Sequence, residues 1–367
     1  MTHSPTAATV TVEPTAAPPA KPTDNTATVA ALRTAHRLQG RRLATICAAL
    51  VAGMVALLSA SVLLGGIGRI DTVDVLPAAF GMRTGLADYV IFQNRVPRAL
   101  AAMLSGALFG LSGVLYQRLV RNPLATPDIV GISAGAGAGA TTVLLFAPAL
   151  PYGAPLAAIA GSFLVVGLVH LLSWRGGIDT YRLVLVGIGL SGVCTAYTNY
   201  LFTVADQHSI AVALRWLVGS VNDVTWDGVG TLAAALVGCV LCAALLSRPL
   251  YAMDLGDGLA TGLGTRVSWA RVAALLLGAA AAALATSVVG PIGFVSLISG
   301  PLAVRLVGAD RSLGLAPLVG AVIVLAADVL ARNAPLISPV PTGALTALIG
   351  APYFVWLILR RRQKAVT

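Results

Sequence analysis

Long apolar runs separated by short polar segments repeat along the chain after residue 42. A run of about 20 apolar residues is the length that crosses a lipid bilayer as an α-helix. Ten runs approach this length, and they lie at 43–65, 96–116, 127–147, 155–173, 183–203, 229–247, 270–290, 292–306, 314–331 and 343–359. The pattern predicts an all-α polytopic membrane protein with about ten transmembrane helices.

The same pattern divides the chain into parts. Residues 1–42 are rich in Ala, Thr and Pro, which predicts a disordered N-terminal tail. Residues 43–362 form the predicted transmembrane domain, and 363–367 form a short C-terminal end. The run at 43–65 is longer than the apolar core of a signal peptide and no A-x-A site follows it, so we expect a permanent span.

Composition and charge further restrict the class of protein to which the chain can belong. The chain is 57% hydrophobic and only 10% charged, which excludes a soluble enzyme, a disulfide scaffold and a disordered chain. The four cysteines lie inside apolar runs without metal-ligand spacing. With the N-terminus inside, about three quarters of the 24 Lys and Arg residues fall on the inner side, so we expect both termini in the cytoplasm. The net charge of +10 therefore does not indicate a nucleic-acid partner.

Two motifs interrupt the apolar pattern near the second and third runs. They are RVPR at 95–98 and RNPLATPDIVGISAG at 121–135. The prolines of the second motif prevent a continuous helix. Asn122 and Ser133 are placed to satisfy the backbone groups that the break frees. A tight helical hairpin with a purely structural role explains the spacing of these residues equally well.

Two glycine patterns add to these motifs. Gly131, Gly135 and Gly139 recur every four residues, so they share a helix face that a neighbouring helix can approach closely. Gly290-Pro291 separates the seventh run from the short eighth. A break of this kind is tolerated in a membrane only inside protein or beside a water-filled cavity.

Three further motifs complete a recognisable set: GPIGFVS at 290–296, LAADVLAR at 325–332 and PTGALTALIGAP at 341–352. In this order the motifs resemble the FecCD family of permeases, the membrane subunits of binding-protein-dependent ABC importers for iron–siderophore complexes, haem and vitamin B12. The resemblance runs from about Arg95 to Arg361. It implies the vitamin B12 permease-like fold of type II ABC importers and a bacterial cytoplasmic (inner) membrane location.

The resemblance assigns residues to two surfaces. Arg95, Arg98 and Arg332 would meet acidic residues of a docked extracytoplasmic binding protein, because arginine offers a planar charged fork for carboxylates. Lipid anchoring is the alternative, and Arg332 lies four residues after Asp328, where a helical ion pair would hold it. Contact with the ATPase subunit would involve Asp254, Leu255, Gly256, Asp257, Gly258, Leu259, Ala260 and Gly264. In that segment Asp254 is expected to cap a short helix that Gly264 ends.

The resemblance also suggests a translocation path. The residues expected at this path or its gate are Asn122, Pro123, Ser133, Trp216, Gly219 and Ser220. Trp216 equally suits an interfacial aromatic anchor. Pro301 stands where the family has a histidine, so this helix end is expected to bend or gate differently.

These features predict a permease subunit that moves a ferric siderophore or similar bulky iron chelate. The chain has no G-x-x-x-x-G-K-[ST] motif, so ATP and Mg²⁺ are expected on a partner and no cofactor or metal on this chain. The expected partners are a second permease subunit (a homodimer in the first place), two ABC ATPases, the extracytoplasmic binding protein and the lipid bilayer. Permeases for haem or cobalamin and a proton-coupled secondary transporter using Asp328 are the alternatives, and a structural ion pair is the favoured role of Asp328.

Overall fold

The computed structural model describes residues 25–64, 89–174, 180–333 and 340–364. These residues form helices without strands. The chain divides into two compact units, Met1–Ala44 and Thr45–Thr367.

Helix α1 (Asn25–Leu63) begins before the first apolar run. Residues 25–42, predicted as part of a disordered tail, are helical in the structure, and Ala, Leu, Arg and Gln among them are good helix formers. Residues 1–24 lie outside the described residues.

The helices follow the predicted order, with short helical turns between some of them. Their bounds are α1, then η1 (Ile91–Arg95), α4 (Val96–Val120), η2 (Pro127–Val130), α5 (Ile132–Phe146), α6 (Gly153–Ser173), α7 (Thr180–Val204), α8 (Gln207–Val218), α9 (Trp226–Asp254), α10 (Asp257–Gly262), α11 (Val267–Val289), α12 (Val295–Val307), η3 (Ala309–Arg311), α13 (Ser312–Asn333) and α14 (Thr342–Lys364).

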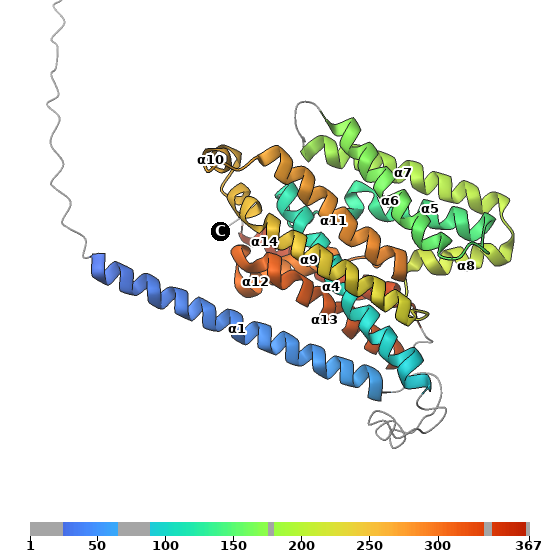
Figure 1. The fold of residues 1–367 in the computed structure, drawn as a ribbon, viewed down its shortest axis with the longest axis horizontal. Coiled ribbons are helices and arrows are strands. Elements are labelled where there is room, and N and C mark those ends of the chain that lie inside the picture. The colour runs from blue at the N-terminus through green and yellow to red at the C-terminus, as the bar shows by residue number, and fades with distance from the viewer. Residues whose placement is uncertain (1–24, 65–88, 175–179, 334–339, 365–367) are drawn as a thin grey trace, which may run out of the picture. The chain divides into compact units, whose positions relative to one another are not determined.

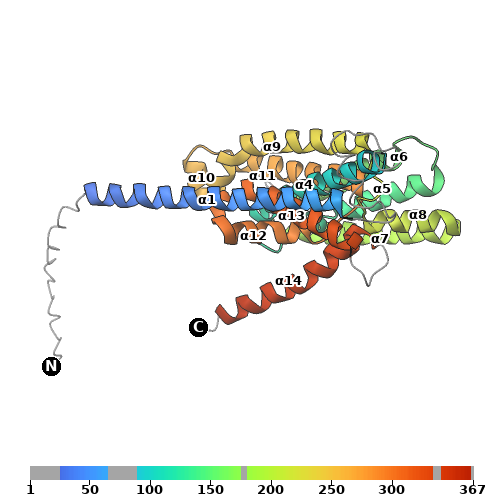
Figure 2. The ribbon, with the colours of Figure 1, turned by 90° about the horizontal axis from the view of Figure 1, so that it is seen from below.

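Ten of these helices occupy the ten predicted apolar runs. Seven are long and apolar enough to cross a membrane, and α5, α12 and the 342–356 part of α14 are shorter apolar helices. The predicted all-helical polytopic fold is confirmed. The short helices α8 and α10 lie between apolar runs, at opposite ends of the bundle (Figure 2). We call these the α8 end and the α10 end.

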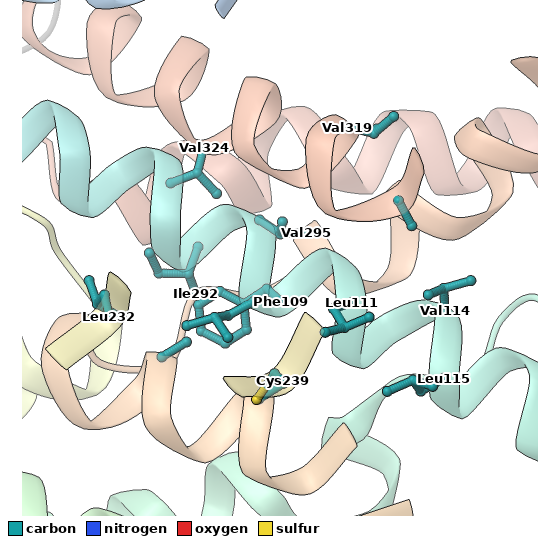
Figure 3. Close-up of a cluster of buried hydrophobic side chains, with 14 of the residues drawn as sticks. Phe109, Leu111, Val114, Leu115, Leu232, Cys239, Ile292, Val295, Val319 and Val324 are labelled. Carbon is teal, nitrogen blue, oxygen red and sulfur yellow. The ribbon is translucent and has the colours of Figure 1, made fainter. Parts of the chain in front are cut away.

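Helix α4 lies at the centre of the larger unit (Figure 1) and packs against α9, α11, α12 and α13. Figure 3 shows apolar side chains of these helices meeting around Phe109 and Leu111. The helix backbones approach one another closely. At Gly113, for example, a Cβ atom would overlap the backbone carbonyl of Ser296. Small residues thus let the helices approach, as van der Waals packing in a membrane requires.

A second group of helices, α5, α6 and α7, packs together beside this core. The predicted glycine face is confirmed for Gly135 and Gly139, where a Cβ atom would overlap backbone atoms of α6. Gly131 does not share this face, because it precedes α5 with φ 88°. The predicted break between the seventh and eighth runs is also present. Gly290 (φ 71°) ends α11, and Phe294 (φ 66°) precedes α12.

Candidate functional site

A buried ion triad joins three segments at the α8 end. The side chain of Asp328 on α13 has no exposed surface. Its Oδ1 lies 2.8 Å from Nη2 and 2.9 Å from Nε of Arg98 on α4. Its Oδ2 lies 3.0 Å from Nη2 of Arg332, one helical turn further along α13. Thr342, at the start of α14, donates its hydroxyl to Oδ1 at 3.2 Å. The predicted helical pair of Asp328 and Arg332 is confirmed.

Further hydrogen bonds from the arginines hold neighbouring segments at this end. Arg98 donates from Nη1 to the side-chain oxygen of Asn222. Arg332 donates to the carbonyl and the hydroxyl of Ser61 on α1. Arg95 donates to the carbonyl of Val62, 2.7 Å away. Sequence reasoning missed Asn222 and Ser61, because nothing in their local pattern marks them as partners of distant arginines.

These contacts bury the three arginines that the resemblance assigns to docking, and that role stays a prediction. Arg95 is 3% exposed and Arg98 is 8% exposed. The side chain of Arg332 is 8% exposed. The guanidinium groups bind a carboxylate and carbonyl oxygens within the chain. Asp328 explains the position of Arg98 and Arg332, because its buried charge requires neighbouring cations.

Three non-helical segments meet beside the triad. The amide of Ser220 donates to the carbonyl of Val289 at 2.8 Å, and the amide of Gly343 donates to the carbonyl of Gly219 at 3.1 Å. Gly219 has φ 76°, and a Cβ atom there would overlap the carbonyl oxygen of Pro291. The turn after α8, the break before α12 and the start of α14 therefore support one another through backbone bonds.

The structure separates the residues predicted for the path or gate into two groups. Trp216, Gly219 and Ser220 lie at the α8 end, where Trp216 packs partly buried against alanines of α5 and α6. Asn122, Pro123 and Ser133 belong to the loop and helix start that follow α4 at the α10 end.

The two polar side chains of the second group have different partners. Asn122 accepts a hydrogen bond from the backbone amide of Leu124 at 3.0 Å, which confirms its predicted role toward the broken backbone. The Ser133 hydroxyl instead donates to the carboxylate of Asp128. Its predicted backbone role is wrong, because the η2 turn places a carboxylate within reach.

A helical hairpin at the α10 end contains the residues predicted to contact the ATPase. Asp254 is the last residue of α9, so it does not cap α10 as predicted; Gly256 (φ 104°) takes that position and Asp257 begins α10. Gly264 has φ 81° in the turn that follows α10. Asp254 does not occupy the cap position of α10 because α9 extends several residues beyond the predicted apolar run.

The hairpin combines ion pairs with exposed apolar side chains. Asp254 lies 3.2 Å from Arg118, and Asp257 lies 2.6 Å from Arg121 and 2.7 Å from Arg271. The exposed leucines of the hairpin are Leu255 (62% exposed), Leu259 (64%) and Leu263 (67%). Exposed apolar side chains of this kind are typical of a surface that contacts another protein or the membrane.

The described residues contain no group of three or more His, Cys, Asp or Glu side chains that could hold a metal ion. The four cysteines are free, and they lie on α1, α7 and α9. The chemistry at both ends of the bundle is therefore that of ion pairs, backbone turns and exposed leucines.

A comparison of folds places this arrangement in a known class. The chain matches a solved structure described as an inward-facing conformation of a metal-chelate type ABC transporter, with a TM-score of 0.76 and 30% identity over 86% of this chain and 99% of that one. The fold is that of a membrane permease of ABC transporters.

The sequence comparisons identify the family. The model of the FecCD transport family matches residues 43–360, and the chain belongs to this family. Similar proteins include the ferric enterobactin transport system permease of Escherichia coli K12, 35% identical over 88% of this chain and 98% of the relative. The achromobactin transport system permease of Dickeya dadantii is 36% identical over 81% and 87%, and the Fe(3+)-citrate import system permease of Bacillus subtilis 38% over 76% and 84%. The apolar helices and these relatives indicate an inner-membrane permease of iron-chelate ABC importers.

Proposed function

We propose that this chain carries a ferric siderophore or a similar bulky iron chelate into the cytoplasm, energised by ATP hydrolysis on a separate ATPase subunit. The relatives named above transport ferric enterobactin, achromobactin and ferric citrate. The observation that carries the proposal is the α10 hairpin, whose exposed leucines would enter a groove of the ATPase. Both termini and the α10 end would then lie on the cytoplasmic side.

A second permease subunit, in the first place an identical copy, would complete the path along α7. This helix has exposed side chains along much of its length, including Tyr197 and Tyr200. Thr195 and Asn199 are exposed beside them within the apolar span. Polar side chains are disfavoured against lipid, so this face suits a partner subunit or a water-filled path. A chelate already supplies the ligands of its iron, and such a path needs no metal-binding cluster.

The extracytoplasmic binding protein would dock at the α8 end. Asp206 is the N-cap residue of α8 and accepts amide hydrogen bonds from His208 and Ser209, each 3.0 Å long. Hydrogen bonds from Ser209 lower the pKa of Asp206 below its usual range. Arg215 on the same helix is exposed and offers a cation that the buried triad does not.

The ion triad weighs against the proton-coupled alternative. A proton carrier must bind and release a proton during each cycle, whereas Asp328 lies between two arginines and accepts a hydroxyl hydrogen bond. Paired in this way, its carboxylate supports the structure at the α8 end.

Purification of the tagged chain from its native membrane tests the proposal. We expect an ABC ATPase to accompany it at one per permease, and Leu259→Ser to reduce that amount severalfold because it removes an exposed apolar contact. The matched control is Leu150→Ser, which changes a leucine of similar exposure (56%) at the α8 end. A folded chain without any ATPase, even after crosslinking, would contradict the proposal.

A further inference from the structure

The residue after α4 has an unusual backbone for its type. Arg121 adopts φ 52° and ψ 33°, in the left-handed region. Glycine is the usual residue where a helix ends in this conformation, since a side chain there is strained. A strained arginine indicates that its side chain has a task that glycine would not perform.

That side chain reaches the α10 hairpin. Nη2 of Arg121 lies 2.6 Å from Oδ1 of Asp257 and donates to the carbonyl of Met253 at 3.1 Å. The second carboxylate oxygen of Asp257 accepts from Nη2 of Arg271 on α11 at 2.7 Å. A single carboxylate on the first turn of α10 thus binds the end of α4 and the start of α11.

Among the described residues, few other side-chain interactions hold α10 in place. Helix α10 has six residues and is flanked by Gly256 and Gly264, both with positive φ and with open space around their Cα atoms. Its buried residue is Ala260, which packs with Met253 and Ala270. Glycines on both sides give the backbone freedom to turn, so the position of α10 depends on this small apolar contact, on Asp257 and on the ion pair of Asp254 with Arg118 at the end of α9.

The loop joined to Arg121 is the one that leads into α5. Asn122 and Pro123 follow directly, and the 122–126 segment is held by backbone bonds to α4 and within itself. Any displacement of α10 that pulls on Asp257 therefore acts on the first residue of this loop.

We propose that Asp257 is a positioning residue that links movement of the α10 hairpin to movement of the 121–126 loop, with Arg121 as its partner. The link rests on the proposed function in so far as the ATPase is what displaces α10. Exposed ion pairs contribute little to stability, so the link can break and re-form during a transport cycle without unfolding the protein.

Hydrogen exchange on the purified permease alone tests the link directly. In Asp257→Asn we expect the amides of Asn122 and of 124–126 to exchange about threefold faster, because their connection to α10 and α11 is weakened. Arg121→Gly should show the same increase with thermal stability no lower than that of the natural chain, since glycine adopts this backbone without strain. The control is Asp310→Asn, an exposed carboxylate of η3 outside the link. Unchanged exchange in both link variants would refute the link.

Transport by the complex with its ATPase gives the second test. In proteoliposomes, the amount of ferric chelate transported per ATP hydrolysed should fall about tenfold in Asp257→Asn and in Arg121→Gly. Asp257→Glu should restore the ratio because the carboxylate is kept, and Asp310→Asn should leave it unchanged. An unchanged ratio in Asp257→Asn would overturn the proposal.

The two tests separate the link from the proposed function. If no ATPase accompanies the natural chain, the proposed function fails, and the exchange experiment still decides whether Asp257 and Arg121 hold the loop. If the ATPase binds and the exchange rate does not change, the link fails and the proposed function stands.

Discussion

Replacing Asp328 by asparagine should destabilise the protein by about 3–5 kcal/mol, the usual effect of removing one partner from a buried ion pair. The carboxylate is completely buried, and the side chains of Arg98 and Arg332 are only 10% and 8% exposed. Asparagine keeps the size of the side chain but leaves both guanidinium groups without a counter-charge in an environment of low dielectric. Most of the loss therefore comes from two uncompensated cations.

A variant that removes all three charges gives a sharper test of this reasoning. Arg98→Met, Asp328→Leu and Arg332→Met together leave no buried charge, and apolar replacement of a buried ionic group is often neutral or stabilising. We expect the triple variant to recover at least half of the loss. It will not recover all of it, because Asn222, Ser61 and Thr342 lose hydrogen-bond partners.

The assay is reversible unfolding in mixed micelles with increasing denaturing detergent, followed by circular dichroism. Asp223→Asn, at an exposed carboxylate near the triad, is the matched control and should change the unfolding free energy by less than about 0.5 kcal/mol. If Asp328→Asn is as stable as this control, the account of the triad is refuted. If the stable variant also loses uptake, Asp328 becomes a candidate proton carrier.

Three further predictions concern other parts of the chain. Gly113→Ala should destabilise by about 1–3 kcal/mol in the same assay because its Cβ overlaps a backbone carbonyl, whereas Gly238→Ala, with open space, should be neutral or slightly stabilising. Leu255→Ser should weaken ATPase binding in a pull-down from membranes, and equal recovery with Leu150→Ser would contradict the contact surface. Asp206→Ala should destabilise the protein at neutral pH and have no effect in acid. Folding lowers the pKa of this carboxylate, so it stabilises the protein above its unfolded pKa and loses that effect as the pH falls through its folded pKa. Thermal melts of the variant and the natural chain across this pH range test this, and a difference in melting temperature that does not change with pH would contradict it.

Much of the fold could be predicted because lipid imposes a simple rule on sequence. Each apolar run must satisfy its backbone internally, so it forms a helix, and the ten predicted runs became ten apolar helices. The glycine face of α5 followed from the same reasoning, since residues four apart share a face. The helical start at Asn25 was missed because composition dominated by Ala, Thr and Pro suggested disorder, although the prolines end before that residue.

The candidate site was less predictable because its contacts join distant residues. Asp328 and Arg332 share a helix, so their pair was visible in the sequence, but Arg98 is 230 positions from Asp328 and nothing local connects them. The resemblance to a family gave the arginines a docking role, and their burial and internal partners could not be seen in the sequence. Likewise, the ion pair of Arg121 and Asp257 spans 136 positions and appears only when α4 and α10 meet at one end of the bundle.

The central claim is that this permease imports an iron chelate with energy from ATP. Its most direct test is uptake of radiolabelled ferric siderophore into proteoliposomes that contain the purified permease–ATPase complex, with the binding protein outside. We expect uptake that requires ATP on the side of the ATPase and persists when a protonophore collapses the pH gradient. Uptake driven by an imposed pH gradient without ATP, and abolished by the protonophore, would contradict it.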